Sequence, residues 1–131
     1  MPFGDTTSPE LEQLASVVVD SIFKVHEKLG PGLLESAYKI CLYHELMKRG
    51  IRVRKEVEVP IIYDGIRLDA GFRLDLLVEE CLIIETKAVE KLHPVTEAQI
   101  LTHLKLMNLR LGFLVNFNVV KIKDGIKRKV R

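Results

Sequence analysis

The segment 72–87, which reads FRLDLLVEECLIIETK, restricts the fold of this chain more than any other. Its two apolar stretches are separated by Glu79-Glu80-Cys81, which is composed like a turn. Continuous apolar runs such as Leu82-Ile83-Ile84 are typical of strands that are covered on both faces. The pattern therefore predicts two neighbouring strands inside a layered α/β domain.

Charged side chains follow directly on this buried run, at Glu85 and Lys87. Residues i and i+2 of a strand share a face, so Glu85 and Lys87 project side by side, away from Thr86. The turn brings Asp75 back alongside Glu85. Two adjacent carboxylates repel each other unless a cation lies between them, and hard oxygen ligands favour magnesium or manganese. A cross-strand salt bridge is the simpler alternative, but charges rarely end a buried strand without a partner or a task.

Composition limits the class of protein. The chain has 131 residues, 47% hydrophobic and 29% charged, which is enough for one core and predicts a single domain over residues 1–131. Cys41 and Cys81 have no C-x-x-C spacing, so we expect free thiols, no zinc site and a reduced cytoplasmic location. No apolar run approaches the roughly 20 residues that a membrane span needs.

Periodicity predicts the other elements. Apolar residues at steps of three and four indicate helices over 9–29 and about 33–49, and Pro94 opens a third helix to about residue 109. Alternation indicates strands near 57–61, 66–68, 72–78 and 111–117, with a tight turn at Asp64-Gly65 and an edge or bulge at Pro60. A helical crossover between the strands at 82–87 and 111–117 predicts a parallel pair beside an antiparallel meander of the earlier strands, and hence a mixed sheet flanked by helices.

The two ends of the chain carry separate expectations. Residues 1–8 are predicted to be a flexible tail, and residues 119–131 a basic hairpin that turns at Asp124-Gly125. Its cations on the outer face would bind phosphates, or equally would form a solvated face that keeps an edge strand from aggregating. Arg73 is expected on the face of Asp75, where it contacts a backbone phosphate or pairs with Glu58. The candidate nucleic-acid-binding residues are therefore Arg73, Lys121, Lys123, Lys127 and Arg128.

Several short motifs together resemble a known family. Gly32, Glu35 and Tyr38 match the signature of the small bacterial and archaeal GxxExxY proteins, which are grouped with the PD-(D/E)xK nuclease superfamily. The resemblance covers nearly the whole chain. It also includes the segments DLLV at 75–78, ETKAVE at 85–90, EAQ at 97–99, NFN at 116–118 and KDGIKR at 123–128.

The resemblance implies a restriction endonuclease-like core and catalysis with Mg²⁺ or Mn²⁺. By that resemblance, Asp75 and Glu85 hold the metal, helped by the backbone carbonyl of Thr86, and Lys87 orients water. Some members add a helical glutamate, here Glu35, as a catalytic residue and candidate further ligand. They also add a glutamine with a tyrosine four residues on. Here these are Gln99, a catalytic candidate, and His103, which replaces the tyrosine and is expected to stack on or contact nucleic acid.

The helical candidates can also be judged from spacing alone. Glu35 and Tyr38 share a helix face, and Glu35 in the first turn could simply complement the helix dipole. Tyr38 is interpreted as a packing residue with a hydroxyl tether. Gln99 and His103, four residues apart, share the face of the third helix that can lean over the sheet; either could instead be a surface polar residue.

Three classes of function fit these observations. The first is a metal-dependent nuclease that hydrolyses phosphodiester bonds of nucleic acid, with DNA the expected substrate. The others are a nucleic-acid-binding module without turnover and a protein-interaction scaffold. The joint presence of Asp75, Glu85 and Lys87 favours the nuclease. A homodimer is expected because a twofold pair suits a duplex; the alternative is a monomer whose first helix packs wholly on its own sheet.

Overall fold

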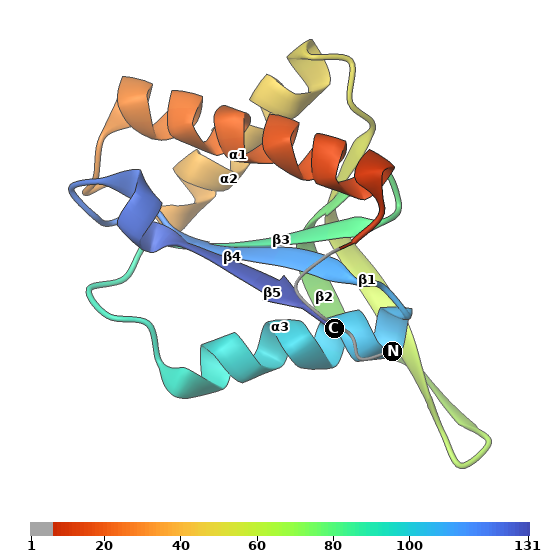
Figure 1. Ribbon diagram of the computed structural model, residues 1–131. Coiled ribbons are helices and arrows are strands. Elements are labelled where there is room, and N and C mark those ends of the chain that lie inside the picture. Colours follow the sequence, from red (N-terminus) through yellow and green to blue (C-terminus); the bar gives the residue numbers. More distant parts are fainter. Residues whose placement is uncertain (1–6) are drawn as a thin grey trace.

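A computed structural model describes residues 7–131 and shows a mixed sheet between two helical layers (Figure 1). Helices α1 and α2 cover one face of the sheet, and α3 covers the other. The elements in chain order are α1 (Pro9–Leu29), α2 (Glu35–Lys48), β1 (Val53–Tyr63), β2 (Ile66–Val78), β3 (Leu82–Lys87), α3 (Pro94–Met107), β4 (Leu111–Asn116), the 3₁₀ helix η1 (Ile122–Gly125) and β5 (Ile126–Val130).

The five strands of the described residues form one sheet in the order β1-β2-β3-β4-β5. Only β3 and β4 are parallel, with Leu82 opposite Leu111 and Lys87 opposite Asn116. Parallel neighbours need a crossover, and α3 provides it. The α/β class, the parallel pair and the antiparallel meander expected from periodicity are therefore confirmed.

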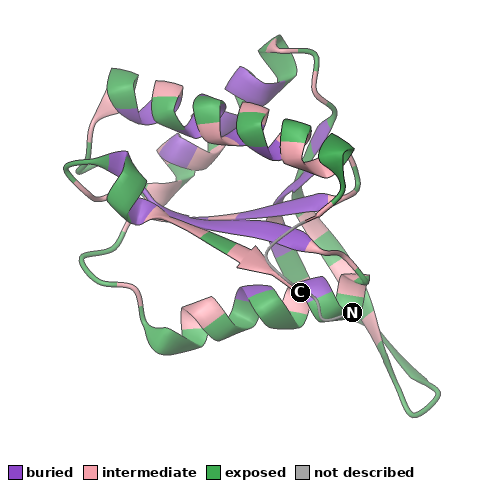
Figure 2. Ribbon diagram, in the orientation of Figure 1, coloured by how far each residue is buried: buried purple, intermediate pink, exposed green. Residues whose placement is uncertain are grey.

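The core has two parts, one on each face of the sheet (Figure 2). On the α1–α2 face, Val18 and Ile22 of α1 are fully buried against the strands. On the α3 face, Ile83 of β3 meets Ile100 and Leu104 of α3. The centre of the apolar stripe of α1 thus packs within the chain's own core, as the monomer alternative describes.

Tyr38 links α1 and α2, the two helices that cover the same face of the sheet. Its ring is fully buried and stacks on Phe117, with centroids 4.6 Å apart. Its hydroxyl donates to the carbonyl of Gly30 at 2.6 Å and accepts from the amide of Leu33 at 3.0 Å. These bonds fasten the turn between α1 and α2, which confirms the interpretation of Tyr38 as a packing residue with a hydroxyl tether.

The β1–β2 hairpin projects beyond the rest of the sheet (Figure 1). Asp64 and Gly65 form its turn with φ of 50° and 79°, a left-handed conformation that glycine adopts without strain. The strand register shifts between Val59 and Ile61, which confirms the irregularity expected at Pro60. The expected division of the second strand near residue 70 is absent, because β2 is one continuous strand from Ile66 to Val78.

The C-terminal segment differs from the expected two-armed hairpin. Residues 122–125 form η1, and β5 pairs with β4 along its length. Gly125 packs so closely on the end of β4 that a Cβ would collide with the Asn116 carbonyl oxygen. Tertiary packing against the buried β4 has therefore replaced the local Asp124-Gly125 turn. The expected tail at residues 1–8 falls mainly on residues 1–6, which lie outside the described residues.

The cations of this segment also do not share one outer face. Lys127 approaches Glu97 of α3 at 3.7 Å, whereas Arg128 bonds Glu12 of α1 at 2.6 Å. Successive residues of a strand point to opposite faces, so the basic residues are divided between two helical layers. The expectation of a single cationic face is wrong, because β5 lies within the layered fold.

Cys41 and Cys81 are free thiols, as their spacing indicated. Within residues 7–131, no helix is both long enough and apolar enough to cross a membrane.

Candidate active site

Asp75 and Glu85 face each other where β2 and β3 separate. The last paired residues are Leu76 and Ile84, and the same register places Asp75 opposite Glu85. The strands part here because the Asp75 carboxylate takes the place of a backbone acceptor. Its Oδ2 accepts the Thr86 amide at 2.8 Å and the Thr86 hydroxyl at 3.2 Å. The two acids thus meet at the edge of the paired region, as the sequence predicted.

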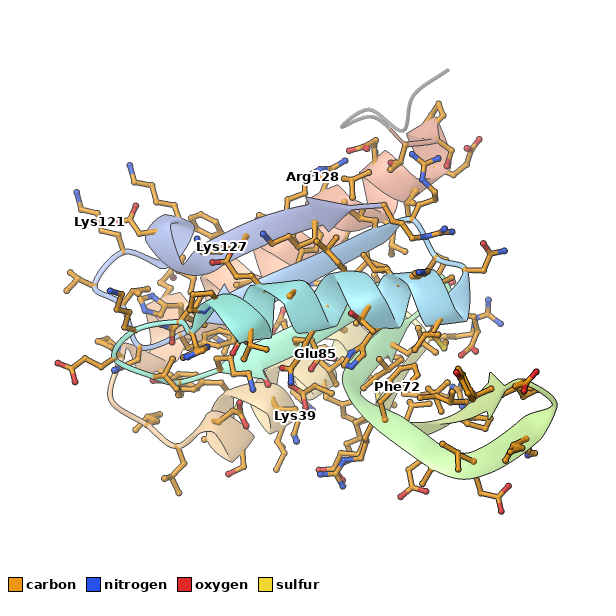
Figure 3. The ribbon with its side chains drawn as sticks, turned by 90° about the horizontal axis from the view of Figure 1, so that it is seen from below. Lys39, Phe72, Glu85, Lys121, Lys127 and Arg128 are labelled. Carbon is orange, nitrogen blue, oxygen red and sulfur yellow. The ribbon has the colours of Figure 1, made fainter. Side chains whose placement is uncertain are left out.

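Glu85 lies beneath α3 with only 13% of its side chain exposed (Figure 3). Its Oε1 is 3.5 Å from Nδ1 of His103, and neither atom has a hydrogen-bond partner among the described residues. The His103 ring stacks on Phe72, with centroids 4.4 Å apart. A buried polar atom without a partner is costly, so this arrangement favours a further group that satisfies the Glu85 oxygen.

The protonation of Glu85 reflects the same surroundings. Burial raises the pKa of this carboxyl from 4.5 to about 7, because the charged form loses solvation. His103 opposes the shift, whereas the neighbouring Asp75 adds to it. Carboxyls whose pKa is raised by burial beside a second carboxylate are frequent at functional sites.

The first turn of α2 brings Glu35 into the same cluster. Glu35 is the first residue of the helix. Burial raises its pKa, and so does the charge of Asp75, while Lys87 and Lys39 act in the opposite direction. These couplings place Glu35 near both the acids and the lysine of the strand motif, although Glu35 and Lys87 make no direct ion pair within the described residues.

Lys39 is a member of the cluster that the sequence interpretation missed. It follows Glu35 by one helical turn, and its ammonium lies 3.9 Å from Asp75 Oδ1 and 3.1 Å from Glu56 Oε1. Only 11% of its side chain is exposed. The i, i+4 spacing from Glu35 was the available signal, because it puts both residues on one helix face.

The donor atoms fit a divalent ion held by two carboxylates. Glu85 Oε1 is buried and lacks a hydrogen bond, and Asp75 presents a second carboxylate opposite it. Within residues 7–131 no three His, Cys, Asp or Glu side chains are close enough to hold a metal together, so Glu35 does not complete a three-ligand set. Magnesium is commonly bound by one or two carboxylates and keeps several waters, so two suffice.

The remaining candidates are on α3 and in the segment around η1. Gln99 is exposed on α3, one turn before His103, whose ring is mostly buried against Phe72 instead of facing solvent. Lys121 and Lys123 are exposed near η1, and Lys121 points outward (Figure 3). They are separate from the carboxylates, so any contact with nucleic acid there would be remote from the site.

The expected placement of Arg73 on the face of Asp75 stays a prediction, because β2 is irregular next to Asp75. Leu74 belongs to the α3-side core, whereas Leu76 belongs to the α1–α2 side, so the alternation of β2 is interrupted at Asp75. Arg73 is exposed and stands opposite Glu58 in the register. Glu58 is the residue with which Arg73 was expected to pair if it does not contact a phosphate.

The chain matches the PD-(D/E)XK nuclease superfamily over residues 12–129 and belongs to that superfamily. The α/β fold with its five-stranded mixed sheet is consistent with the core of this class of phosphodiester hydrolases, which are typically metal-dependent. Comparisons with curated proteins and with solved structures gave no match.

Proposed function

We propose that this protein is a nuclease that uses Mg²⁺ or Mn²⁺ to hydrolyse phosphodiester bonds of nucleic acid, with DNA as the substrate. The observation that carries the proposal is the opposed pair Asp75 and Glu85 at the point where β2 and β3 separate, with a buried Glu85 oxygen that lacks a partner. Membership of the superfamily supports the chemistry.

Each residue of the cluster has a role in this proposal. A divalent ion supplies Lewis acidity and lowers the pKa of water bound to it. Asp75 and Glu85 would hold the ion, together with the Thr86 carbonyl. Lys87, which ends β3, stabilises the nucleophile or the charge that develops on the phosphate. Glu35 orients water near the ion, and the exposed Gln99 contacts a phosphate oxygen without adding charge.

The protonation of Glu85 links binding of the ion to pH. With a pKa of about 7, its carboxyl is partly protonated at neutral pH, and a metal ligand must be deprotonated. Binding of the ion therefore releases a proton from the site. Metal affinity, and with it cleavage, should rise as the pH increases through 7.

The ion pairs of β5 favour catalysis over simple binding. A binding module would depend on its cations, yet Lys127 and Arg128 contact Glu97 and Glu12 within the chain. Glu85 Oε1, by contrast, is buried without a hydrogen-bond partner among the described residues. We also propose membership of the GxxExxY group, which the roles of Tyr38 and Glu35 support, and a homodimer whose interface lies outside the buried stripe of α1.

The test is cleavage of labelled DNA and RNA, single- and double-stranded, with Mg²⁺ or Mn²⁺ and with a chelator. The wild-type chain should cut only with the ion, and Lys87→Ala should lose activity by orders of magnitude while its affinity for metal and substrate remains. Lys105→Ala, on the exposed part of α3, is the matched control. Cleavage by Lys87→Ala at the wild-type rate would reduce Lys87 to a structural residue.

A further inference from the structure

The ammonium of Lys39 is held between two carboxylates at the edge of the site. It lies 3.1 Å from Glu56 Oε1 and 3.9 Å from Asp75 Oδ1. Its side chain is 11% exposed, whereas those of Asp75 and Glu56 are 21% and 50% exposed. A lysine this deeply buried needs counter-charges, and Lys39 has two, the more exposed Glu56 and the less exposed Asp75.

The backbone conformation of β1 places Glu56 within reach of Lys39. The register of β1 and β2 pairs Lys55 with Leu76 and Val57 with Leu74, which sets Glu56 opposite Asp75. Glu56 has φ of 54°, a left-handed conformation that non-glycine residues seldom adopt. The local distortion coincides with the break in the alternation of β2, and it leaves the carboxylates of both strands within reach of one ammonium from α2.

This arrangement leaves Asp75 with one oxygen for which two cations compete. Its Oδ2 already accepts two hydrogen bonds from Thr86. Its Oδ1 faces Lys39 and is the oxygen that remains for another ligand. A divalent ion at Asp75 and Glu85 would therefore lie near a fixed positive charge, which like-charge repulsion disfavours.

We propose that Lys39 is the resident counter-ion of Asp75 and competes with the divalent ion for that carboxylate, while Glu56 draws Lys39 away from it. The inference rests on the proposed function, because it concerns the same site. Lys39 is a positioning residue here. It lowers the affinity for the ion, and Glu56 partly restores it.

Calorimetric titration of the full chain with Mn²⁺ tests the competition. Lys39→Gln should bind Mn²⁺ at least about fivefold more tightly than the wild type, the range of a typical coupling between two sites. Glu56→Gln should bind more weakly, because Lys39 then turns wholly to Asp75. In the double variant the Glu56→Gln effect should largely vanish. Lys28→Gln on α1 is the control for loss of one exposed charge.

Other outcomes overturn the proposal. A purely structural Lys39 predicts unchanged or weaker Mn²⁺ binding in Lys39→Gln, and a Glu56→Gln effect that persists in the double variant means that Glu56 acts without Lys39. If both the wild type and Lys39→Gln bind equally well, only the competition fails. If neither binds, the competition fails together with the proposed nuclease.

Unfolding in a chelator examines the ion pair without metal and shows whether the variants fold. Lys39→Gln should have a lower Tm than the wild type, because Asp75 and Glu85 lose a neighbouring positive charge. Adding Asp75→Asn should recover part of the loss. Lys39→Met, which keeps the apolar stem, is the second variant. An unchanged Tm in both single variants would show that Lys39 is not the counter-ion of Asp75.

Discussion

Glu85 Oε1 and His103 Nδ1 lie 3.5 Å apart, and each is buried without a hydrogen bond among the described residues. The histidine cannot move away freely, because its ring is stacked on Phe72. His103 of α3 therefore covers Glu85 of β3, and the fold holds these two polar side chains together without giving either atom a hydrogen bond. The behaviour of this pair with pH and metal gives the most direct tests of the site.

Stability of the metal-free protein should fall as the pH rises from about 4.5 to about 7. In this range folded Glu85, with its pKa raised to about 7, keeps a proton that the unfolded chain has released. The loss amounts to about 3 kcal/mol at most, from the size of the shift. Urea unfolding of wild type and Glu85→Gln at pH 5 and pH 7 measures it.

The difference between the two proteins isolates Glu85 from the other titrating groups. Glu85→Gln should gain stability relative to the wild type at pH 7 and differ little at pH 5. A gap that stays constant between these pH values would mean that Glu85 titrates normally in the folded state.

Asp75→Asn should abolish binding of Mg²⁺ and bring the pKa of Glu85 down toward its ordinary value, because the charge of Asp75 helps to raise it. Asparagine keeps an oxygen that can accept from the Thr86 amide, so the fold should survive. Calorimetry gives the first quantity, and NMR titration of the Glu85 carboxyl gives the second. Retained Mg²⁺ affinity would exclude Asp75 as a ligand.

His103→Phe should weaken metal binding at pH 7 while keeping the ring contact with Phe72. Removing the imidazole takes away an interaction that lowers the pKa of Glu85, so more of the carboxyl is protonated. At pH 9 the variant and the wild type should bind Mn²⁺ almost equally. Equal weakening at both pH values would instead indicate that His103 acts by shaping the site.

Lys121 and Lys123 should contribute more to nucleic-acid affinity than Lys127, because they are exposed and Lys127 is near Glu97. Replacing both with glutamine should reduce the slope of log K against log salt by about two, one counterion for each phosphate contact. Lys127→Gln is the matched comparison. Fluorescence anisotropy over a salt series provides the slopes, and identical slopes for the three proteins would remove η1 from the binding surface.

Tyr38→Phe should destabilise the fold by about 1–3 kcal/mol, since it leaves the Gly30 carbonyl and the Leu33 amide without their partner. The stacking on Phe117 is kept, so the loss should measure the tether alone. Denaturant unfolding gives the value. A neutral substitution would mean that water replaces the hydroxyl at no cost.

Local pattern was sufficient for most of the architecture and for the centre of the site. Apolar periodicity predicted α1, and the Ser8 hydroxyl caps this helix by accepting the Leu11 amide at 3.2 Å. The pairing of Asp75 with Glu85 followed from a short turn and a period of two. Such features depend on neighbours within a few residues, which is why one sequence can reveal them.

Only the tertiary structure decided what surrounds that centre. The sequence could not show that β5 would join β4 and divide its cations between α1 and α3. This pairing depends on the free backbone groups along one side of the buried strand β4, which only the assembled sheet defines. Nor could it place Phe72 against His103 or Lys39 between Asp75 and Glu56. These contacts join elements distant in the chain, and their geometry depends on the packing of helices on the sheet, which local propensity does not contain.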